Sequence, residues 1–214
     1  MGCTVVVWGP WKGILLKLFR FGTSAGRRTG RAILLALCYA LAPLGFPLSA
    51  AEKETAPEVS EYAIKAACLY NFLLFTDWPE QTFETKETAI RVAVAGFDPF
   101  GSLLEAAMKD KQVRGHAIEI VRVKEGQPVP KCHLLFCSAK ERKAVEKLLG
   151  GQKGRPVLTV GEAADFCEWG GIAQVYLDHG KLRFAFNIGA VGESGLKIDP
   201  KLLRLAKVVN VRGK

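Results

Sequence analysis

The first long apolar pattern along the chain, VSEYAIKAACLYNFLLFTDWPE (residues 59–80), has the periodicity of a helix. Ser60 is the expected N-cap and Pro79 the expected stop. Apolar side chains recur along one helical stripe at Tyr62, Ala66, Leu69, Phe72 and Phe75. The pattern therefore predicts one amphipathic helix at the start of the folded region.

Beyond this helix, short apolar runs alternate with helical patterns. Four runs have the length and composition of strands: AIRVAVAG (89–96), AIEIVRV (117–123), HLLFC (133–137) and PVLTVG (156–161). Between and after them the sequence predicts three helices: one from Gly101 to Lys109, one over ERKAVEKLLGG (141–151) and a short one near EAADFCE (162–168).

The last third of the chain predicts a pair of strands and a closing helix. GIAQVYLD (171–178) and KLRFAFNI (181–188) are joined at His179-Gly180, which indicates a β-hairpin. IDPKLLRLAKVV (198–209) predicts a short helix with Asp199 as cap and Pro200 at its first position. Together the elements predict the α/β class: a single-domain α/β sandwich with a mixed sheet flanked by helices, and a C-terminal β-hairpin followed by a short helix.

The N-terminal region has the composition of a secretory signal. Three arginines (Arg27, Arg28 and Arg31) precede an apolar run over residues 32–46, and small residues end the segment at Ala50 and Ala51. The apolar run is about 15 residues long, short of the roughly 20 needed to span a bilayer. We therefore interpret residues 1–51 as a signal peptide cleaved after Ala50 or Ala51, residues 52–58 as a flexible lead, and residues 59–210 as one domain in the periplasm.

The net charge changes once this segment is set aside. The whole chain carries a formal +9, but residues after Ala51 contain 24 Lys and Arg against 21 Asp and Glu, which leaves +3. These charges are dispersed among one another, as on an ordinary solvated surface. The excess of basic residues is thus a targeting feature, and no nucleic-acid partner is expected.

Four cysteines remain after Ala51, and in an exported chain they are candidates for disulfide or redox chemistry: Cys68, Cys132, Cys137 and Cys167. If KCHLLFC is extended, the sulfurs of Cys132 and Cys137 start about 16 Å apart, too far to pair. Two pairings stay open: Cys68–Cys132 with Cys137–Cys167, or Cys68–Cys137 with Cys132–Cys167. We expect at least one disulfide; the alternative is that some of these thiols are buried and free, as on the apolar stripe that carries Cys68.

No catalytic motif is visible. The three histidines, His116, His133 and His179, are scattered, and none stands in a pattern that places it beside a thiol. Nucleophile-elbow, phosphate-loop and dinucleotide-binding patterns are missing from the sequence, and so is the spacing of a zinc site. The residues favour binding or regulation over an enzyme, with no cofactor and no metal.

Several segments, in this order and spacing, resemble the YfiR family. They are EYAIKAACLYNFLLFTDWPE, IRVAVAGFDPFG, KCHLLFCS, PVLTVGEAADFCEWGG and LRFAFNIGAVGESGLKIDPKLLRLAKVV. The resemblance runs from Tyr62 to Val209. The residues that match its motifs include Tyr62, Lys65, Asn71, Trp78, Arg183, Phe184 and Asn187.

This resemblance implies a periplasmic, dimeric α/β protein that restrains an inner-membrane diguanylate cyclase, and thereby modulates cyclic di-GMP signalling and biofilm formation. It also implies disulfides linked to redox control. Two departures weaken the redox part: Cys68 stands where many relatives carry Phe, and the strand AIRVAVAG lacks the cysteine of some relatives. The alternative function is a small-ligand-binding accessory protein of a sensor kinase, with the ligand at the carboxyl ends of the strands.

Overall fold

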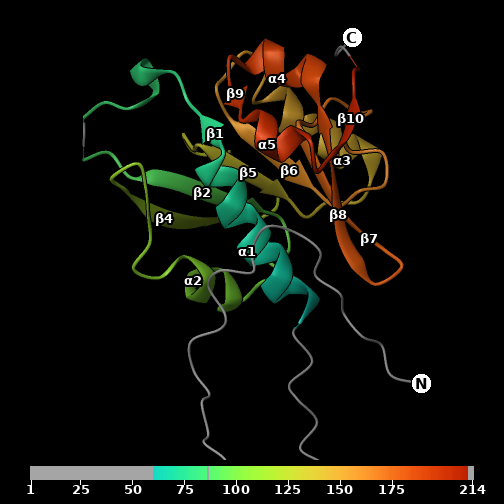
Figure 1. The fold of residues 1–214 in the computed structure, drawn as a ribbon, viewed down its shortest axis with the longest axis horizontal. Coiled ribbons are helices and arrows are strands. Elements are labelled where there is room, and N and C mark those ends of the chain that lie inside the picture. Colours follow the sequence, from blue (N-terminus) through green and yellow to red (C-terminus); the bar gives the residue numbers. More distant parts are fainter. Residues whose placement is uncertain (1–59, 86, 212–214) are drawn as a thin grey trace, which may run out of the picture. The chain divides into compact units, whose positions relative to one another are not determined.

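The structure is a computed structural model and describes residues 60–85 and 87–211. The signal-peptide interpretation and the flexible lead fall on residues outside these ranges. Figure 1 shows the described part as a central sheet with helices on both faces. The helices are α1 (Glu61–Leu74), α2 (Leu103–Met108), α3 (Arg142–Gly150), α4 (Ile188–Ser194) and α5 (Pro200–Leu203), with a 3-10 turn at Glu80–Thr82.

An eight-stranded mixed sheet forms the centre, with the strand order β10-β8-β7-β6-β5-β2-β4-β3. Its strands are β2 (Ile90–Ala95), β3 (Gln112–Val113), β4 (His116–Val123), β5 (Leu134–Cys137), β6 (Leu158–Gly161), β7 (Ala173–Asp178), β8 (Lys181–Asn187) and β10 (Lys207–Val209). The five strands from β4 to β7 run parallel, β3 is antiparallel to β4, and β8 is antiparallel to β7 but parallel to β10. The α/β class and the mixed sheet that the sequence predicts are confirmed.

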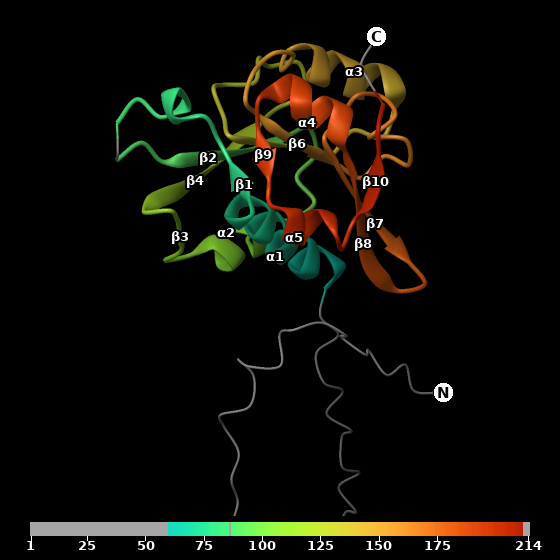
Figure 2. The same cartoon turned by 45° about the horizontal axis from the view of Figure 1, so that its top comes forward.

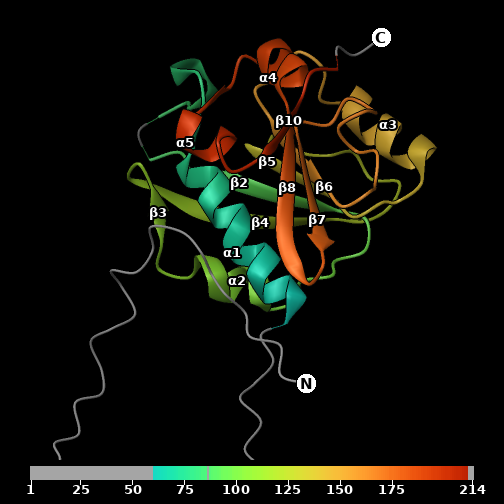
Figure 3. The same ribbon diagram turned by 45° about the vertical axis from the view of Figure 1, so that its right-hand side comes forward.

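Each face of the sheet has its own core. Alternate residues of β2 and β5 point to opposite sides, so Val92 and Phe136 pack under α1 while Ala93 and Leu135 pack under α3. Figures 1 and 3 show α1 and α3 on opposite faces. The sheet therefore separates two apolar layers that do not touch each other.

Helix α1 forms where the sequence predicts it but ends earlier. Pro79 is not its stop, because Thr76 already leaves the helix: its hydroxyl donates to the Phe72 carbonyl at 2.7 Å, and Thr76 pairs with Ile198. This pairing joins β1 (Thr76–Asp77) to β9 (Lys197–Ile198), side by side in Figure 2. Ser60 stands at the N-cap position, but its backbone carbonyl rather than its side chain accepts the first helical bonds.

The predicted hairpin is confirmed. His179 (φ 49°) and Gly180 (φ 72°) both have positive φ, as the tight turn between β7 and β8 requires. In α5, Asp199 caps the helix by accepting from the Lys201 N–H at 2.7 Å, as expected.

Two predictions in the C-terminal half are wrong. The segment EAADFCE forms consecutive turns rather than a helix, because the fully buried Phe166 ring fills the space beside Gly161 and Gly171. The closing helix stops after four residues at Leu203, and Lys207–Val209 instead pairs as β10 with β8. Helix α4, which carries two glycines, was not predicted.

Candidate interaction surface

The outward side of α1 is apolar. We call Ile64, Ala67, Asn71 and Leu74 the α1 outer stripe, since their spacing places them on one side of the helix, opposite its buried residues. Ile64 is 44% exposed and Leu74 37% exposed, and Ala67 is exposed as well. A surface helix normally shows charged residues on this side. Among its 14 residues α1 carries only two charged side chains, Glu61 and Lys65, and neither belongs to the stripe.

The apolar surface continues from α1 toward β8. Figure 3 shows α1 beside β8, and the half-buried Phe184 ring packs edge-on against Phe72 with centroids 5.3 Å apart. Cys68 and Phe75, both half-buried, pack against the same core. These side chains extend the α1 outer stripe into a wider apolar area.

A buried charged cluster fixes the first turn of α1. The Lys65 Nζ lies 3.0 Å from Glu162 Oε1, forms an ion pair with Glu61 and stands 4.6 Å from the centre of the Tyr62 ring. Tyr62 donates its hydroxyl to Glu162 at 3.4 Å, and burial together with the Glu162 charge raises the pKa of Tyr62. Because Glu162 directly follows β6, the cluster ties α1 to the carboxyl end of that strand.

Trp78 and Asn187 hold the fold from inside. The Trp78 indole donates to the His133 carbonyl at 3.1 Å. The Asn187 carbonyl oxygen accepts from the backbone N–H of Gly189, Ala190 and Val211, and its amide donates to the Cys167 carbonyl at 3.0 Å. Both residues are buried, so neither can contact a partner directly.

Arg183, Asn71 and Phe184 reach the surface. Arg183 is exposed on the hairpin, with its Nε 3.9 Å from an Asp178 carboxylate oxygen. Asn71 is half-buried on the α1 outer stripe, and Phe184 is half-buried beside it. Of the residues matched to family motifs, these three and the half-buried Tyr62 reach the surface, and Tyr62 is already engaged with Glu162. The apolar Ile64 and Leu74, and the Lys65 partner Glu162, were not singled out from the sequence.

The four cysteines after Ala51 are free thiols, so the expected disulfide is not formed. Cys68 packs on the α1 side of the sheet, whereas Cys132 and Cys137 belong to the core on the α3 side. Both pairings that the sequence left open use Cys68 with one of those two residues. The intervening sheet excludes them.

We expect all four thiols to react slowly in the folded protein. Burial raises the pKa of Cys68, Cys137 and Cys167 to about 12 and of Cys132 to about 11. Iodoacetamide at pH 8 should therefore modify Cys68 and Cys137 on the order of 10³-fold more slowly than a free cysteine, and Cys132 less slowly than either.

Peptide mass spectrometry after timed alkylation measures these rates. The control is alkylation in urea without reductant, in which all four cysteines should react. A cysteine that stays unmodified in urea would show a disulfide and contradict the free-thiol state.

His133 is buried in an aromatic stack. The centre of its ring lies 5.0 Å from the centre of the Phe83 ring, and the two rings are stacked. Phe83 also stacks on His116, with the ring centres 4.3 Å apart. His133 Nδ1 accepts from the Arg91 backbone N–H at 2.9 Å, while its Nε2 is buried without a partner. Burial, followed by the charges of Lys131 and Arg91, lowers the pKa of His133 to about 4. The ring is thus a neutral core residue, in agreement with the structural role expected from the sequence.

This lowered pKa predicts a loss of stability in acid. In the unfolded chain His133 binds a proton as the pH falls below 6.5, whereas in the folded protein it stays neutral down to about pH 4. The free energy of unfolding therefore decreases as the pH falls through this window. We expect the free energy of unfolding to decrease by roughly 2 kcal/mol between pH 7 and pH 4.5 from this group. Urea unfolding across this range measures it. His133→Asn should be less stable at every pH but have a flatter pH dependence; an unchanged slope would contradict the assignment.

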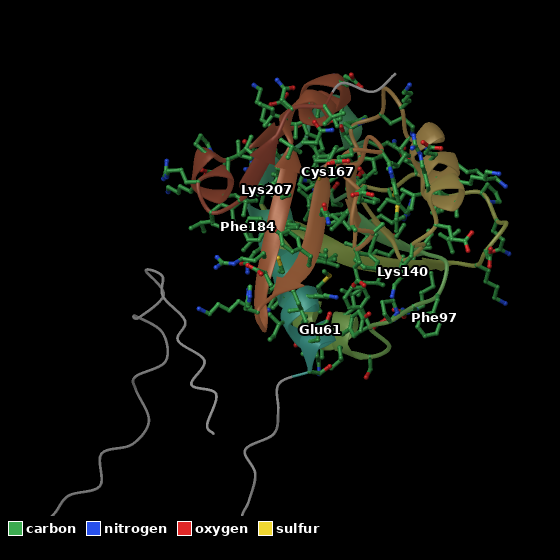
Figure 4. All side chains as sticks on the ribbon, turned by 90° about the vertical axis from the view of Figure 1, so that its right-hand side faces the viewer. Glu61, Phe97, Lys140, Cys167, Phe184 and Lys207 are labelled. Atoms are coloured by element: carbon green, nitrogen blue, oxygen red, sulfur yellow. The ribbon has the colours of Figure 1, made fainter. Side chains whose placement is uncertain are left out.

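The carboxyl end of β2 is tightly packed. Gly96 follows β2 with a φ of +92°, and a Cβ there would lie 2.7 Å from the Ser138 hydroxyl, which donates to the Ala95 carbonyl. Phe97 projects into solvent from the same loop, and Figure 4 shows it near Lys140, which follows β5. This edge therefore offers an exposed aromatic side chain.

Two cavities of about 530 Å³ each lie near the amino ends of β5 and β6, away from the carboxyl ends of these strands. Trp169, Arg142 and Glu193 line the first, and Lys131 and Cys132 line the second. The expected ligand position at the strand carboxyl ends is therefore not where these cavities are. Within the described ranges, no helix has both the length and the apolar character to cross a bilayer.

Comparison with known proteins agrees with the resemblance. A family model described as YfiR/HmsC-like matches residues 62–207. A search of the curated proteins gave no match. The matched range covers most of the chain and includes α1, the Lys65 cluster, the hairpin and Asn187. The chain therefore belongs to the YfiR/HmsC-like family.

Proposed function

We propose that this chain is a periplasmic regulatory protein that binds an inner-membrane diguanylate cyclase and restrains it, thereby modulating cyclic di-GMP. The observation that carries the binding part of this proposal is the α1 outer stripe. Ile64 and Leu74 stand on a helix whose outward side has no charged residue. Membership in the YfiR/HmsC-like family supports the regulatory part.

The environments of the cysteine and histidine side chains favour binding over catalysis. A cysteine nucleophile requires a lowered pKa and a nearby base. Here burial raises the pKa of the Cys132 and Cys137 thiols, and the His133 ring is buried without access to them through solvent. We infer a non-enzymatic role from these environments.

A partner helix would suit the α1 outer stripe. Apolar anchors spaced three to four residues apart are the usual contact of one helix with another helix or groove. Complete burial of a side chain such as Ile or Leu contributes about 1.5–3 kcal/mol to association. The half-buried Asn71 and the exposed Arg183 add polar contacts beside the apolar ones.

The test is the cellular level of cyclic di-GMP. Deletion of the gene should raise this level, and expression of the exported chain should restore it. A deletion strain with unchanged cyclic di-GMP, under reducing, oxidising and envelope-stress conditions, would contradict the proposal. Sequencing the N-terminus of the chain from the periplasmic fraction would establish export and the cleavage after Ala50 or Ala51.

One observation favours the second candidate function, a small-ligand-binding accessory protein of a sensor kinase. A volume of about 530 Å³ lies within the range of small-molecule sites, and Trp169 offers an aromatic wall beside charged side chains. A thermal-shift screen with small periplasmic metabolites tests it. A hit that disappears in Trp169→Ala would support this function, and a screen without hits would remove it.

We propose that the protein forms a homodimer, on the same observation that supports binding of the cyclase, the α1 outer stripe. The α1 outer stripe is uncharged and could cover a second copy of itself around a two-fold axis. Light scattering of the purified protein distinguishes a dimer from a monomer. A dimer that hides α1 would compete with the cyclase for this surface.

A further inference from the structure

A second exposed surface crosses the edge of the sheet at the end of the fold. Residues 201–208 leave α5, turn, and enter β10, the terminal strand of the eight-stranded sheet. Leu202 is buried and Leu203 and Ala206 are half-buried, so these three side chains anchor the segment. The remaining side chains are exposed: Lys201, Arg204, Leu205, Lys207 and Val208. Lys207 and Val208 are consecutive in β10 and therefore point to opposite sides of this edge strand.

Two of these side chains are large, apolar and exposed. Leu205 is 67% exposed and Val208 is 47% exposed, among only seven large apolar side chains exposed in the described ranges. Leu205 stands in the turn between α5 and β10, where no packing requirement accounts for a leucine. The position therefore suits a contact with something outside the chain.

The other three side chains are cations that pair with no carboxylate of the described residues. Residues 201–208 contain no Asp or Glu. Among the described residues, neither Lys201 nor Arg204 nor Lys207 forms an ion pair. The nearest carboxylate in the sequence, Asp199, is engaged in capping α5. The segment thus joins exposed apolar side chains with unneutralised positive charge.

We propose that this surface, which we call the C-terminal edge surface, lies on a membrane that contains anionic phospholipid. Cations meet the phosphate groups there, and Leu205 enters the boundary between headgroups and acyl chains. This combination of Lys and Arg with an exposed apolar residue is the chemistry by which proteins bind an anionic bilayer without spanning it. Leu205 is 67% exposed among these cations, so the segment offers an apolar side chain and positive charges together.

The outer face of α3 provides a comparison within the same protein. Lys140, Lys143 and Lys147 are also exposed cations outside any ion pair of the described residues. None of the exposed large apolar side chains belongs to α3. Figure 4 shows Lys140 well separated from Lys207. These lysines match the C-terminal edge surface in charge; α3 itself carries no exposed large apolar side chain, although the exposed Phe97 lies near Lys140.

The proposal does not depend on which enzyme the protein restrains. It requires only that the folded chain meets an anionic bilayer. Vesicle binding by the purified protein can therefore fail while cyclic di-GMP control holds, and the converse is equally possible. The two results are distinguishable.

The experiment is co-sedimentation with vesicles of phosphatidylglycerol and phosphatidylcholine, compared with phosphatidylcholine alone, at about 0.1 M salt. We expect binding to the anionic vesicles only. Lys201→Gln with Arg204→Gln and Lys207→Gln should weaken the partition coefficient on the order of 100-fold, since each cation contributes about five-fold. Leu205→Gln should weaken it about ten-fold, because it removes an inserted apolar side chain.

The matched control is Lys140→Gln with Lys143→Gln and Lys147→Gln, which removes the same charge from α3 and from the residue two places before it. It should change binding less than five-fold. All variants keep the same N-terminus, so the contribution of that segment cancels, and circular dichroism checks that each is folded. Equal loss in the two triple variants, binding to neutral vesicles as strong as to anionic ones, or no binding to either would overturn the proposal.

Discussion

Asn187→Ala should lower the free energy of unfolding by about 3–5 kcal/mol, which is enough to unfold a large share of a typical domain. Asn187 is completely buried and uses both ends of its amide. Its carbonyl oxygen accepts from the N–H of Gly189 at 3.1 Å and of Val211 at 3.0 Å, and its Nδ2 donates to the Cys167 carbonyl at 3.0 Å. One side chain therefore joins β8, the start of α4, the turn before β7 and the end of the chain.

The loss is large because several partners stay buried after the side chain is removed. A missing N-cap alone costs about 1 kcal/mol. Each buried donor or acceptor left unsatisfied adds about 1–3 kcal/mol. Urea unfolding followed by circular dichroism measures the change, and Asn210→Ala, at an exposed asparagine nearby, should stay within about 0.5 kcal/mol. A loss below 1 kcal/mol for Asn187→Ala would mean that water replaces the amide.

Ile64→Lys combined with Leu74→Lys should abolish the restraint of the cyclase without unfolding the protein. Lysine has a good helix propensity, and both side chains are already exposed, so stability should change by less than about 1 kcal/mol. The loss of two apolar anchors and the burial of two charges should weaken association by more than about 100-fold. Cells that carry this variant should have the cyclic di-GMP level of the deletion strain.

A control with the same charge change separates surface from charge. Glu125→Gln with Gln127→Lys adds the same +2 in the exposed loop after β4 and should restore wild-type cyclic di-GMP. Immunoblots of the periplasmic fraction establish that both variants accumulate equally. Full restraint by the α1 variant at normal abundance would show that the partner binds elsewhere.

The elements that the sequence predicts well are those whose signals are local. The apolar runs of β2, β4, β5 and β6, and the His179-Gly180 turn, form within a few residues of their predicted positions. In each case the periodicity or the turn chemistry resides in the segment itself. The same holds for Asp199 and Pro200 at the start of α5.

The elements that were missed depend on distant partners. Helix α4 contains Gly189 and Gly192, which disfavour a helix, and it forms because Asn187 satisfies its first N–H groups. Strand β10 follows a helical pattern, but β8 leaves an edge open to pair with Val208 and Val209. Contacts with residues distant in the sequence therefore determine the formation of both α4 and β10.

The candidate surface was only partly predictable for a related reason. A helical stripe identifies the buried side of α1, but its apolar outer side becomes apparent only when nothing in the described chain covers it. Lys65 was named from its motif, whereas Glu162 lies 97 residues away in sequence and is brought to it by β6. The expected pairings fail because the sequence does not reveal that the sheet stands between Cys68 and the thiols of Cys132 and Cys137.

The most direct test of the central claim is a site-specific photocrosslink from Ala67, in the middle of the α1 outer stripe, in living cells. We expect an adduct with an inner-membrane protein that carries a diguanylate cyclase domain, identified by mass spectrometry, and no such adduct from the same crosslinker at Lys147 on α3. An adduct of the chain with itself alone, or a cyclase adduct only from Lys147, would contradict it.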